Sequence, residues 1–340
     1  MLQSLRQAGA AEGAAAPADC SKEKAPMREV AGKVAFITGG SSGIGLGIAR
    51  AFATAGMKVA IGYRTREHIR VAMELFGNMA SQVHAISVDV TDRPGMEKAA
   101  AEVARVFGKI HVLVNNAGVV HHVPLSQTSY EDWDWVINVN LNGVFNGLQA
   151  FLPYIQKHRE GGQIIATASM DGLVAEPWHN PSYTASKFAV VGMMEGLRAT
   201  LAESNIGVST YCPGAVKTQI ADSDRNRPGG RRNAARAQSL GKELSSKEDK
   251  LQSELFMDPF TAGELVLRGM RSNDLYILTH PEYEPIVRDR NEALLAAFPK
   301  DLQASSAQVE RLRSWRQESV YRKERDRISC TRVKRAKSTK

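Results

Sequence analysis

Tyr183 and Lys187 have the side-chain types and the spacing that proton transfer to or from an alcohol requires. If residues 183–200 form a helix, positions four apart share a face, so the ammonium group lies close to the phenol. A free phenol has a pKa of about 10, and a neighbouring positive charge lowers it toward neutral pH, where proton exchange with a substrate oxygen is most efficient. The same pair also occurs on ordinary solvated helices, so its meaning depends on the rest of the chain.

A glycine-rich segment at residues 38–45, Thr-Gly-Gly-Ser-Ser-Gly-Ile-Gly, lies upstream of that pair. It directly follows a short apolar run and precedes a helical pattern. Glycines at such a junction let the backbone approach a pyrophosphate, to which the amide groups at the helix N terminus point. The segment therefore predicts a dinucleotide site, and a dinucleotide beside Tyr183 and Lys187 predicts hydride transfer.

Seven short apolar runs and the helical stretches between them must position these groups. The runs are rich in Val and Ile, and each has the length of a buried strand. They cover residues 34–38, 58–62, 83–88, 111–114, 163–167, 207–212 and 275–279, and helices are expected at 44–56, 94–107, 130–156 and 183–204. Repeated strand–helix–strand units predict an α/β fold, a single doubly wound Rossmann-type domain whose parallel sheet is covered on both faces.

Composition divides the chain into parts. Residues 1–32 are rich in Ala, Gly and Pro, so we expect a disordered N-terminal extension that does not pack, with Met27 as an alternative start. Residues 33–300 are expected to form the catalytic domain, which contains a long polar loop at 220–255. Residues 301–340 form a basic C-terminal tail.

The charge of the chain is concentrated in this tail. Positions 310–340 carry 12 Lys and Arg against 4 Asp and Glu, which accounts for the whole formal charge of +8. We expect a disordered or fraying helical appendage, with partner binding or targeting as the alternative. Since the rest of the chain is neutral, we do not expect a nucleic-acid partner.

Two further absences bear on the cellular setting. No uninterrupted apolar run of about 18 residues occurs, so we expect no membrane span. The three cysteines, Cys20, Cys212 and Cys330, lie far apart and have no metal-ligand spacing. We therefore expect no metal, and a reducing compartment such as the cytoplasm is the simplest assumption.

The end of the second apolar run bears on cofactor choice. About 20 residues after the glycine-rich segment, an NAD site places an acidic residue that binds the adenosine ribose. Here the run ends in Tyr63, which Arg64 follows, and no carboxylate is present. Arg64 can instead pair with the 2′-phosphate of NADP. We therefore favour NADP(H); NAD(H) is the alternative, in which Arg64 and Arg66 are merely solvated loop charges.

The motifs of residues 33 to about 298, taken together, resemble the classical short-chain dehydrogenase/reductase family. In chain order they are Thr38-Gly-Gly-Ser-Ser-Gly-Ile-Gly45, Asp89-Val90, Asn115-Asn-Ala-Gly118, Asn140, Ser169, Tyr183-x-x-x-Lys187 and Pro213-Gly214. So many motifs in the family's order leave little room for coincidence. The resemblance implies a seven-stranded doubly wound sheet and an NAD(P)-dependent oxidoreductase acting on CH–OH donors. It also implies a homodimer or homotetramer joined through the helices at 130–156 and 183–204.

The resemblance assigns the catalytic work to Asn140, Ser169, Tyr183 and Lys187. In the family the tyrosine is the general acid/base, the lysine lowers its pKa and holds the nicotinamide ribose, the serine binds the substrate oxygen, and the asparagine positions a water in a proton relay. Reasoning from the residues leaves Ser182 and Thr167 as alternatives to Ser169, which ends a predicted strand at the edge where open α/β sheets bind ligands. The residues and the resemblance together predict a cofactor-binding set of Gly39, Ser41, Ser42, Gly43, Ile44, Gly45, Arg64, Asp89, Val90, Asn116, Ala117, Gly118, Tyr183, Lys187, Pro213, Gly214, Val216 and Thr218.

The substrate side offers fewer signals. Aromatic candidates for the mouth of the site are His121, His122, Trp178 and His179. Without clustered carboxylates, they favour a hydrophobic or aromatic small molecule that is interconverted between secondary alcohol and ketone, although arginines at 225–232 would attract an anionic group. Residues 128–143 and 275–278 also resemble dehydrogenases that oxidise benzylic (C-alpha) alcohols of lignin-type aryl ethers, and related sequences serve secondary metabolism. The alternative function is a catalytically silent, dinucleotide-sensing protein.

Overall fold

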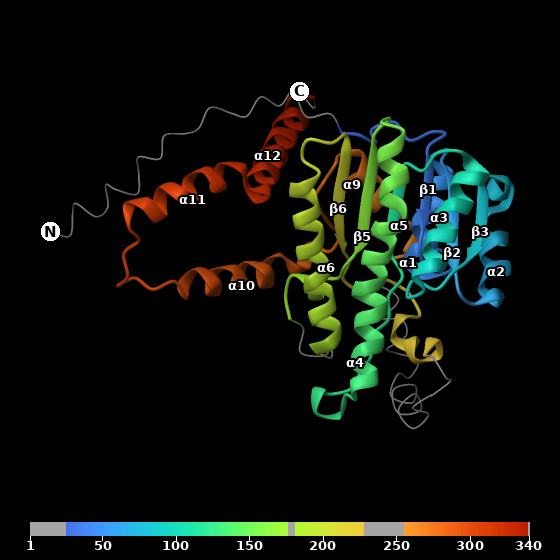
Figure 1. The fold of residues 1–340 in the computed structure, drawn as a ribbon, viewed down its shortest axis with the longest axis horizontal. Coiled ribbons are helices and arrows are strands. Elements are labelled where there is room, and N and C mark those ends of the chain that lie inside the picture. The colour runs from blue at the N-terminus through green and yellow to red at the C-terminus, as the bar shows by residue number, and fades with distance from the viewer. Residues whose placement is uncertain (1–24, 176–180, 228–254, 339–340) are drawn as a thin grey trace. The chain divides into compact units, whose positions relative to one another are not determined.

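The computed structural model describes residues 25–175, 181–227 and 255–338 (Figure 1). Two compact units make up this part of the chain, residues 25–298 and residues 299–338. Among the helices of the described ranges, none has the length and the apolar character needed to cross a membrane.

All seven predicted strands are present in the larger unit, and they form one parallel sheet. The order across the sheet is β3-β2-β1-β4-β5-β6-β7. The strands are β1 (Val34–Ile37), β2 (Lys58–Tyr63), β3 (Val83–Ser87), β4 (Val112–Asn115), β5 (Gly162–Thr167), β6 (Ile206–Cys212) and β7 (Tyr276–Leu278). The predicted doubly wound, seven-stranded α/β fold of the Rossmann type is confirmed.

Helices cover both faces of this sheet (Figure 1). They are α1 (Gly43–Thr54), α2 (Arg66–Phe76), α3 (Arg93–Phe107), α4 (Tyr130–Ile137), α5 (Gly143–Lys157), α6 (Pro181–Thr200) and α9 (Pro259–Arg271). Helix α10 (Glu284–Ala296) follows β7 and has no buried residue. The helix predicted at 130–156 is divided by a π-helical turn at Asn138–Asn142. Helix α2 has no counterpart among the predicted helices, because only Ala72 and Phe76 of it are buried and its sequence is otherwise mostly polar.

Strand β1 shows why apolar runs become central strands here. Its residues are all buried, and successive side chains face opposite sides of the sheet. Val34 and Phe36 belong to the core under α3 and α5, whereas Ala35 and Ile37 belong to the core under α1 and α9. The ring of Phe36 stacks on Phe151 with 4.4 Å between centroids. Because burial of such a side chain contributes roughly 1.5–3 kcal/mol, a run that is apolar at every position is most stable where both faces are covered.

The N-terminal boundary predicted at residue 33 is too late. Met27 and Val30 are buried in the core beneath α1, with 0% and 1% of their surface exposed. The Gly32 N–H also donates to the Gly56 carbonyl at 2.8 Å. The interpretation of residues 1–32 as wholly unpacked is therefore wrong from residue 25 onward, and residues 1–24 lie outside the described ranges. Two buried side chains are too few to give a periodic signal.

The long polar loop predicted at 220–255 is described only near its two ends. Ile220–Asn226 forms a 3-10 helical segment that packs on the domain. Its Ser223 is buried, and the Ser223 Oγ accepts a hydrogen bond from the Val120 N–H at 3.1 Å. Residues 228–254 lie outside the described ranges, so the structure does not test the rest of this loop.

The smaller unit, residues 299–338, contains α11 (Ser306–Glu318) and α12 (Val320–Ser338). Ser305 caps α11 through a reciprocal pair of hydrogen bonds with Gln308, at 3.3 Å and 2.8 Å. Helix α11 has no buried residue. Of the two forms expected for the tail, the described part has the helical one.

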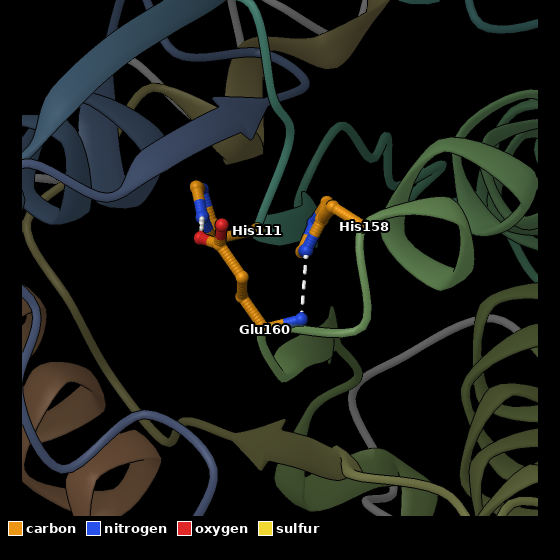
Figure 2. A group of neighbouring side chains, drawn as sticks. All are labelled: His111, His158 and Glu160. Carbon is orange, nitrogen blue, oxygen red and sulfur yellow. Dashed lines mark hydrogen bonds and ion pairs between the residues drawn. The ribbon is translucent and has the colours of Figure 1, made fainter.

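His111, His158 and Glu160 form a hydrogen-bonded cluster at the amino-terminal ends of β1, β4 and β5 (Figure 2). The Val34 N–H donates to Nδ1 of His111 at 3.1 Å, and Nε2 of His111 lies 3.2 Å from Glu160 Oε2. The Glu160 N–H donates to His158 Nδ1 at 3.1 Å, while His158 Nε2 donates to the Ile110 carbonyl at 2.8 Å. Although these side chains offer ligand atoms within 4.8 Å of one another, every ring nitrogen already has a hydrogen-bond partner. The cluster is therefore explained by a structural role, in which its hydrogen bonds connect the segments that precede these strands.

This cluster makes stability depend on pH. Burial lowers the pKa of His111 to about 4, and hydrogen bonds from Lys109 and His111 lower the pKa of Glu160 to about 2. An unfolded histidine binds a proton below pH about 6.5, whereas folded His111 stays neutral until the pH approaches 4. Between these values the unfolded state binds more protons, so the free energy of unfolding must fall as the pH falls.

We predict that His111→Asn flattens this pH dependence, because an amide oxygen can accept from the Val34 N–H and does not titrate. Relative to wild type, the variant should lose less stability between pH 6.5 and pH 4, by up to roughly 3 kcal/mol. Urea unfolding of both proteins across this range measures the difference. Parallel stability curves would contradict the assignment of this dependence to His111.

Candidate active site

The carboxyl ends of β1, β4, β5 and β6 border a cleft of about 460 Å³. Open parallel sheets bind ligands at this edge, and the volume is in the usual range for small-molecule sites. A depression of about 840 Å³ adjoins the cleft over α1 and α9, but none of the predicted catalytic residues lines it. The smaller cleft is therefore the candidate site.

The glycine-rich segment lines the cleft beside α1, and its glycines are required by backbone conformation and close packing. Gly39 and Gly43 have φ angles of 63° and 51°, in the left-handed region that favours glycine. A Cβ at Gly39 would lie 3.2 Å from Ala117 Cα, and one at Gly43 would lie 3.0 Å from Thr218 Cγ2. Gly45 does not line the cleft, but a side chain there would collide with the Gly39 carbonyl. Since α1 begins at Gly43, its first amide groups lie at the cleft and fit a pyrophosphate.

Thr38 joins the glycine-rich segment to the end of β4. Its Oγ1 accepts hydrogen bonds from the Asn116 N–H at 2.8 Å and the Ala117 N–H at 3.0 Å. The Asn116 side chain donates back to the Thr38 carbonyl at 3.1 Å and accepts from Thr167 Oγ1 at 3.2 Å. These hydrogen bonds connect the carboxyl ends of β1, β4 and β5 and fix their relative positions at the cleft.

Lys187 brings a buried charge to the cleft from α6. Its Nζ donates to the Thr167 carbonyl at 3.0 Å and lies 5.5 Å from the centroid of the Tyr183 ring. Only 3% of Lys187 is exposed. Burial lowers the pKa of Lys187 to about 8, and the charge effects of Cys212 and Asp171 oppose this lowering. The predicted pair therefore lies together at the cleft, and the lysine is still mostly protonated at neutral pH.

Asn140 lies in the π-helical turn between α4 and α5. Its Oδ1 accepts from the Val119 N–H at 2.8 Å, and its Nδ2 donates to the Val119 carbonyl at 2.9 Å and to Ser186 Oγ at 3.1 Å. Asn140 is 1% exposed and does not line the cleft. π-helical turns often mark functional sites, and this one joins the loop after β4 to α6.

Ser169 follows β5 and lines the cleft, as predicted. The two competing residues are placed differently. Ser182 is fully buried and does not line the cleft. Thr167 does line it, but its hydroxyl donates to the Asn116 side chain. The geometry therefore favours Ser169 as the hydroxyl that meets a substrate.

Arg64 and Asp89 lie together in the lining of the cleft, just after the ends of β2 and β3. Arg64 NH1 donates to Asp89 Oδ2 at 3.3 Å, and Arg64 NH2 donates to the Asn226 carbonyl. Burial alone would raise the pKa of Asp89, but hydrogen bonds from Thr91 and the Arg64 charge hold this pKa below its usual value. The Arg64 guanidinium thus lines the cleft, as its predicted pairing with a 2′-phosphate requires, and it also donates a hydrogen bond to the Asp89 carboxylate.

All the predicted cofactor-binding residues except Gly45 line this cleft, Tyr183 and Lys187 among them. The predicted catalytic residue Ser169 lines it as well. Sequence reasoning missed other lining residues, including Asp171, Ser223 and Tyr283. The position of Asp171, two residues after Ser169, was a usable signal. Ser223 and Tyr283 come from segments without a recognised motif, so the sequence alone did not point to them.

The predicted substrate-side aromatics divide between different places. His122 lines the cleft. His121 is buried instead, with its ring nitrogens 3.5 Å from Asp132 Oδ2 and 3.4 Å from Asp224 Oδ1. Trp178 and His179 lie outside the described residues. Apolar lining comes from Val119, Val120, Val216, Ile220, Phe256 and Tyr283.

The chain is similar to known proteins in both sequence and fold. A family model described as short chain dehydrogenase matches residues 33–229. The chain is 33% identical over 298 residues to a C alpha-dehydrogenase of Sphingobium sp.. The matched region covers 85% of this chain and 95% of that protein.

Two solved structures show the same similarity. A short chain dehydrogenase/reductase from Burkholderia phymatum in complex with NAD is 32% identical, with a TM-score of 0.71, covering 82% of this chain and 99% of that one. A short chain dehydrogenase from Burkholderia cenocepacia in complex with NADP is 26% identical, with a TM-score of 0.59, covering 74% and 96%. One of these two proteins is thus in complex with NAD and the other with NADP.

Proposed function

Because the chain belongs to the short-chain dehydrogenase family, we propose that it is an NADP-dependent oxidoreductase that interconverts a secondary alcohol and a ketone. The observation that carries the proposal is the convergence of Ser169, Tyr183 and Lys187 on the cleft that also contains the glycine-rich segment. NAD(H) is the alternative cofactor. A panel of aromatic and aliphatic secondary alcohols and ketones, followed by nicotinamide absorbance, tests the activity directly.

The residues of the cleft fit a nicotinamide dinucleotide, which when bound supplies the acceptor or donor of the hydride. We assign the pyrophosphate to the start of α1 and the segment Ser41–Gly43, which lines the cleft and presents the first amide groups of the helix. Asp89 and Val90 would line the adenine. Pro213, Gly214, Val216 and Thr218 would flank the nicotinamide.

Tyr183 is assigned as the general acid/base. When an alcohol loses hydride from carbon, its hydroxyl proton must leave as well, and a phenolate in the cleft can take it. The protonated Lys187, whose Nζ lies 5.5 Å from the ring centroid, favours the phenolate electrostatically. In the reverse direction the Tyr183 hydroxyl returns the proton to the ketone oxygen.

Ser169 and Asn140 are assigned supporting roles. The Ser169 hydroxyl would contact the reacting oxygen and fix its position. Asn140 would position a water in a proton relay. Its contacts with Val119 and Ser186 hold its side chain in one orientation.

The apolar lining of the cleft supports a hydrophobic or aromatic substrate. Side chains such as Val119, Val120 and Ile220 line the cleft. The similar Sphingobium protein is named a C alpha-dehydrogenase, which favours a lignin-type benzylic alcohol; a secondary metabolite is the alternative. Arg225 lines the cleft, but its NH1 donates to the Gln219 and Asp222 carbonyls, so it supports an anionic substrate less well.

We also propose that α5 and α6 form the interface of a homodimer or homotetramer. Phe145 on α5 is 45% exposed, and a Cβ at Gly192 or Gly196 of α6 would meet no described atom within 4 Å. Small residues on an exposed helix face permit close approach of another helix.

This interface predicts a multiple of the monomer mass. Light scattering at micromolar concentration should give two or four times that mass. Gly192→Arg should shift the mass toward the monomer, because a long charged side chain would enter the interface. A wild-type monomer at this concentration would contradict the proposal.

Removal of the Tyr183 hydroxyl tests the proton path. We predict that Tyr183→Phe lowers kcat by at least about 10²-fold, the usual lower contribution of acid/base catalysis. Affinity for the dinucleotide should change less than about threefold, because this variant removes only a hydroxyl. Tyr130→Phe, at a tyrosine that is 89% exposed, is the matched control and should leave both quantities unchanged. Substantial turnover by Tyr183→Phe would contradict the proposed proton path. If the wild-type protein binds dinucleotide but converts no compound of the panel, the alternative function as a dinucleotide-sensing protein is favoured.

The cofactor preference rests on Arg64. A guanidinium pairing with a 2′-phosphate contributes roughly 1.5–3 kcal/mol, or about ten- to a hundredfold in affinity. Arg64→Ala should therefore weaken NADP binding at least about tenfold and leave NAD binding nearly unchanged.

Arg66→Ala is the matched control, since it removes the same charge from an exposed side chain that does not line the cleft. Isothermal titration with each dinucleotide measures these effects. If the wild-type protein binds NAD more tightly than NADP, the preference must be reversed.

A further inference from the structure

Asp171 is a buried carboxylate in the wall of the cleft, outside the family motifs recognised in the sequence. It lies in a short 3-10 turn, Met170–Gly172, between β5 and α6, and it is 1% exposed. A buried carboxylate costs free energy unless hydrogen bonds or opposite charges compensate for it. Its surroundings therefore indicate what this group does.

The contacts of Asp171 connect it to Ser169. The Ser169 Oγ–H donates to Asp171 Oδ2 at 3.3 Å, and the Asp171 N–H donates to Ser169 Oγ at 3.2 Å. Thr184 Oγ1, from the first turn of α6, donates to the other carboxylate oxygen at 3.2 Å. Asp171 thus holds Ser169 through both side chain and backbone, while Thr184 holds the carboxylate itself.

A hydroxyl has one donor and two acceptor positions. Without a partner in the protein, the Ser169 side chain would sample several rotamers about its single χ angle. The two bonds to Asp171 select one of them and still leave one lone pair of the oxygen for a ligand. When a reacting oxygen binds, the Ser169 proton can rotate from the carboxylate to that oxygen without any movement of Oγ.

We propose that Asp171 is a positioning residue for the proposed reaction, holding the Ser169 hydroxyl in place for the reacting oxygen and presenting a negative charge near Lys187. This inference rests on the proposed function. It goes beyond that function by making the residue two positions after the serine part of the catalytic arrangement.

The charge environment of Lys187 supports the second part of the proposal. Besides burial, the groups that influence the pKa of Lys187 are Cys212 and Asp171. Burial raises the pKa of Cys212 to about 12, so at neutral pH this residue is an uncharged thiol. Asp171 is then the formal negative charge of this group, and it favours the protonated lysine.

Three variants separate positioning from a merely structural role. Asp171→Ala removes the acceptor and should lower kcat by about ten- to a hundredfold, with dinucleotide affinity changed less than about threefold. Asp171→Asn keeps an oxygen acceptor but removes the charge. Its kcat should fall less, and the alkaline limb of its pH–rate profile should move to lower pH, because Lys187 loses its proton more readily. Asp134→Asn removes the same charge from an exposed position and should change neither the rate nor the profile.

A double-mutant cycle with Ser169→Ala decides whether Asp171 acts through the serine. If it does, Asp171→Ala should lower kcat by less than about threefold in the Ser169→Ala background. Thermal unfolding of each variant, with and without dinucleotide, shows whether it is folded. Should Asp171→Ala be unfolded, the cycle is made with Asp171→Asn, whose smaller fall in kcat must likewise disappear in the serine variant.

A kcat of Asp171→Ala within twofold of wild type, or effects that add in full in the cycle, would overturn the inference. An unshifted alkaline limb in Asp171→Asn would overturn its electrostatic part. Tyr183→Phe is measured in parallel. If Tyr183→Phe is inactive while the Asp171 variants behave as wild type, this inference fails and the proposed function stands. If Tyr183→Phe is active, the proposed function itself fails.

Discussion

The buried ammonium of Lys187 is the constraint on which the arrangement of the cleft depends. A charge that is only 3% exposed must be compensated locally, and the compensating groups come from different elements. The Thr167 carbonyl at the end of β5 accepts its hydrogen bond, and the Asp171 carboxylate lies in the turn that follows. Because α6 carries both Lys187 and Tyr183, the position that satisfies the lysine also fixes the phenol at the cleft.

The sheet supplies that arrangement through its connectivity. β1, β4, β5 and β6 are parallel neighbours, so their carboxyl ends lie along one edge and the loops after them border one cleft. Thr38 joins two of these ends through hydrogen bonds to Asn116 and Ala117. None of the described residues at the amino-terminal ends of the strands lines the cleft. There His111, His158 and Glu160 form hydrogen bonds that contribute to stability instead. Chemistry and stability are thus placed at opposite ends of the same strands.

Much of this could be predicted from the sequence, because the relevant patterns are local. A run that is apolar at every position, such as Val34–Ile37, indicates a strand covered on both faces, and glycines at 39 and 43 indicate a backbone that must come close to a ligand. Other features depend on contacts between distant segments. Met27 and Val30 are buried in the core beneath α1, and no local sequence pattern predicts this burial. Helix α2 was not predicted because most of its residues are polar and few are buried. The carboxylate of Asp171 becomes meaningful only when the fold shows which groups it meets.

In the proposed reaction, hydride passes between the carbinol carbon of a secondary alcohol and a nicotinamide ring in this cleft. The most direct measurement uses an alcohol from the active part of the panel with deuterium on its carbinol carbon, and determines the deuterium content of the reduced dinucleotide by mass spectrometry. We predict one deuterium in the dinucleotide for each ketone formed, and a slower single-turnover rate than with the undeuterated alcohol. Ketone formation in which the deuterium appears in water would contradict it, because the carbon–hydrogen bond would then break by proton loss and not by hydride transfer.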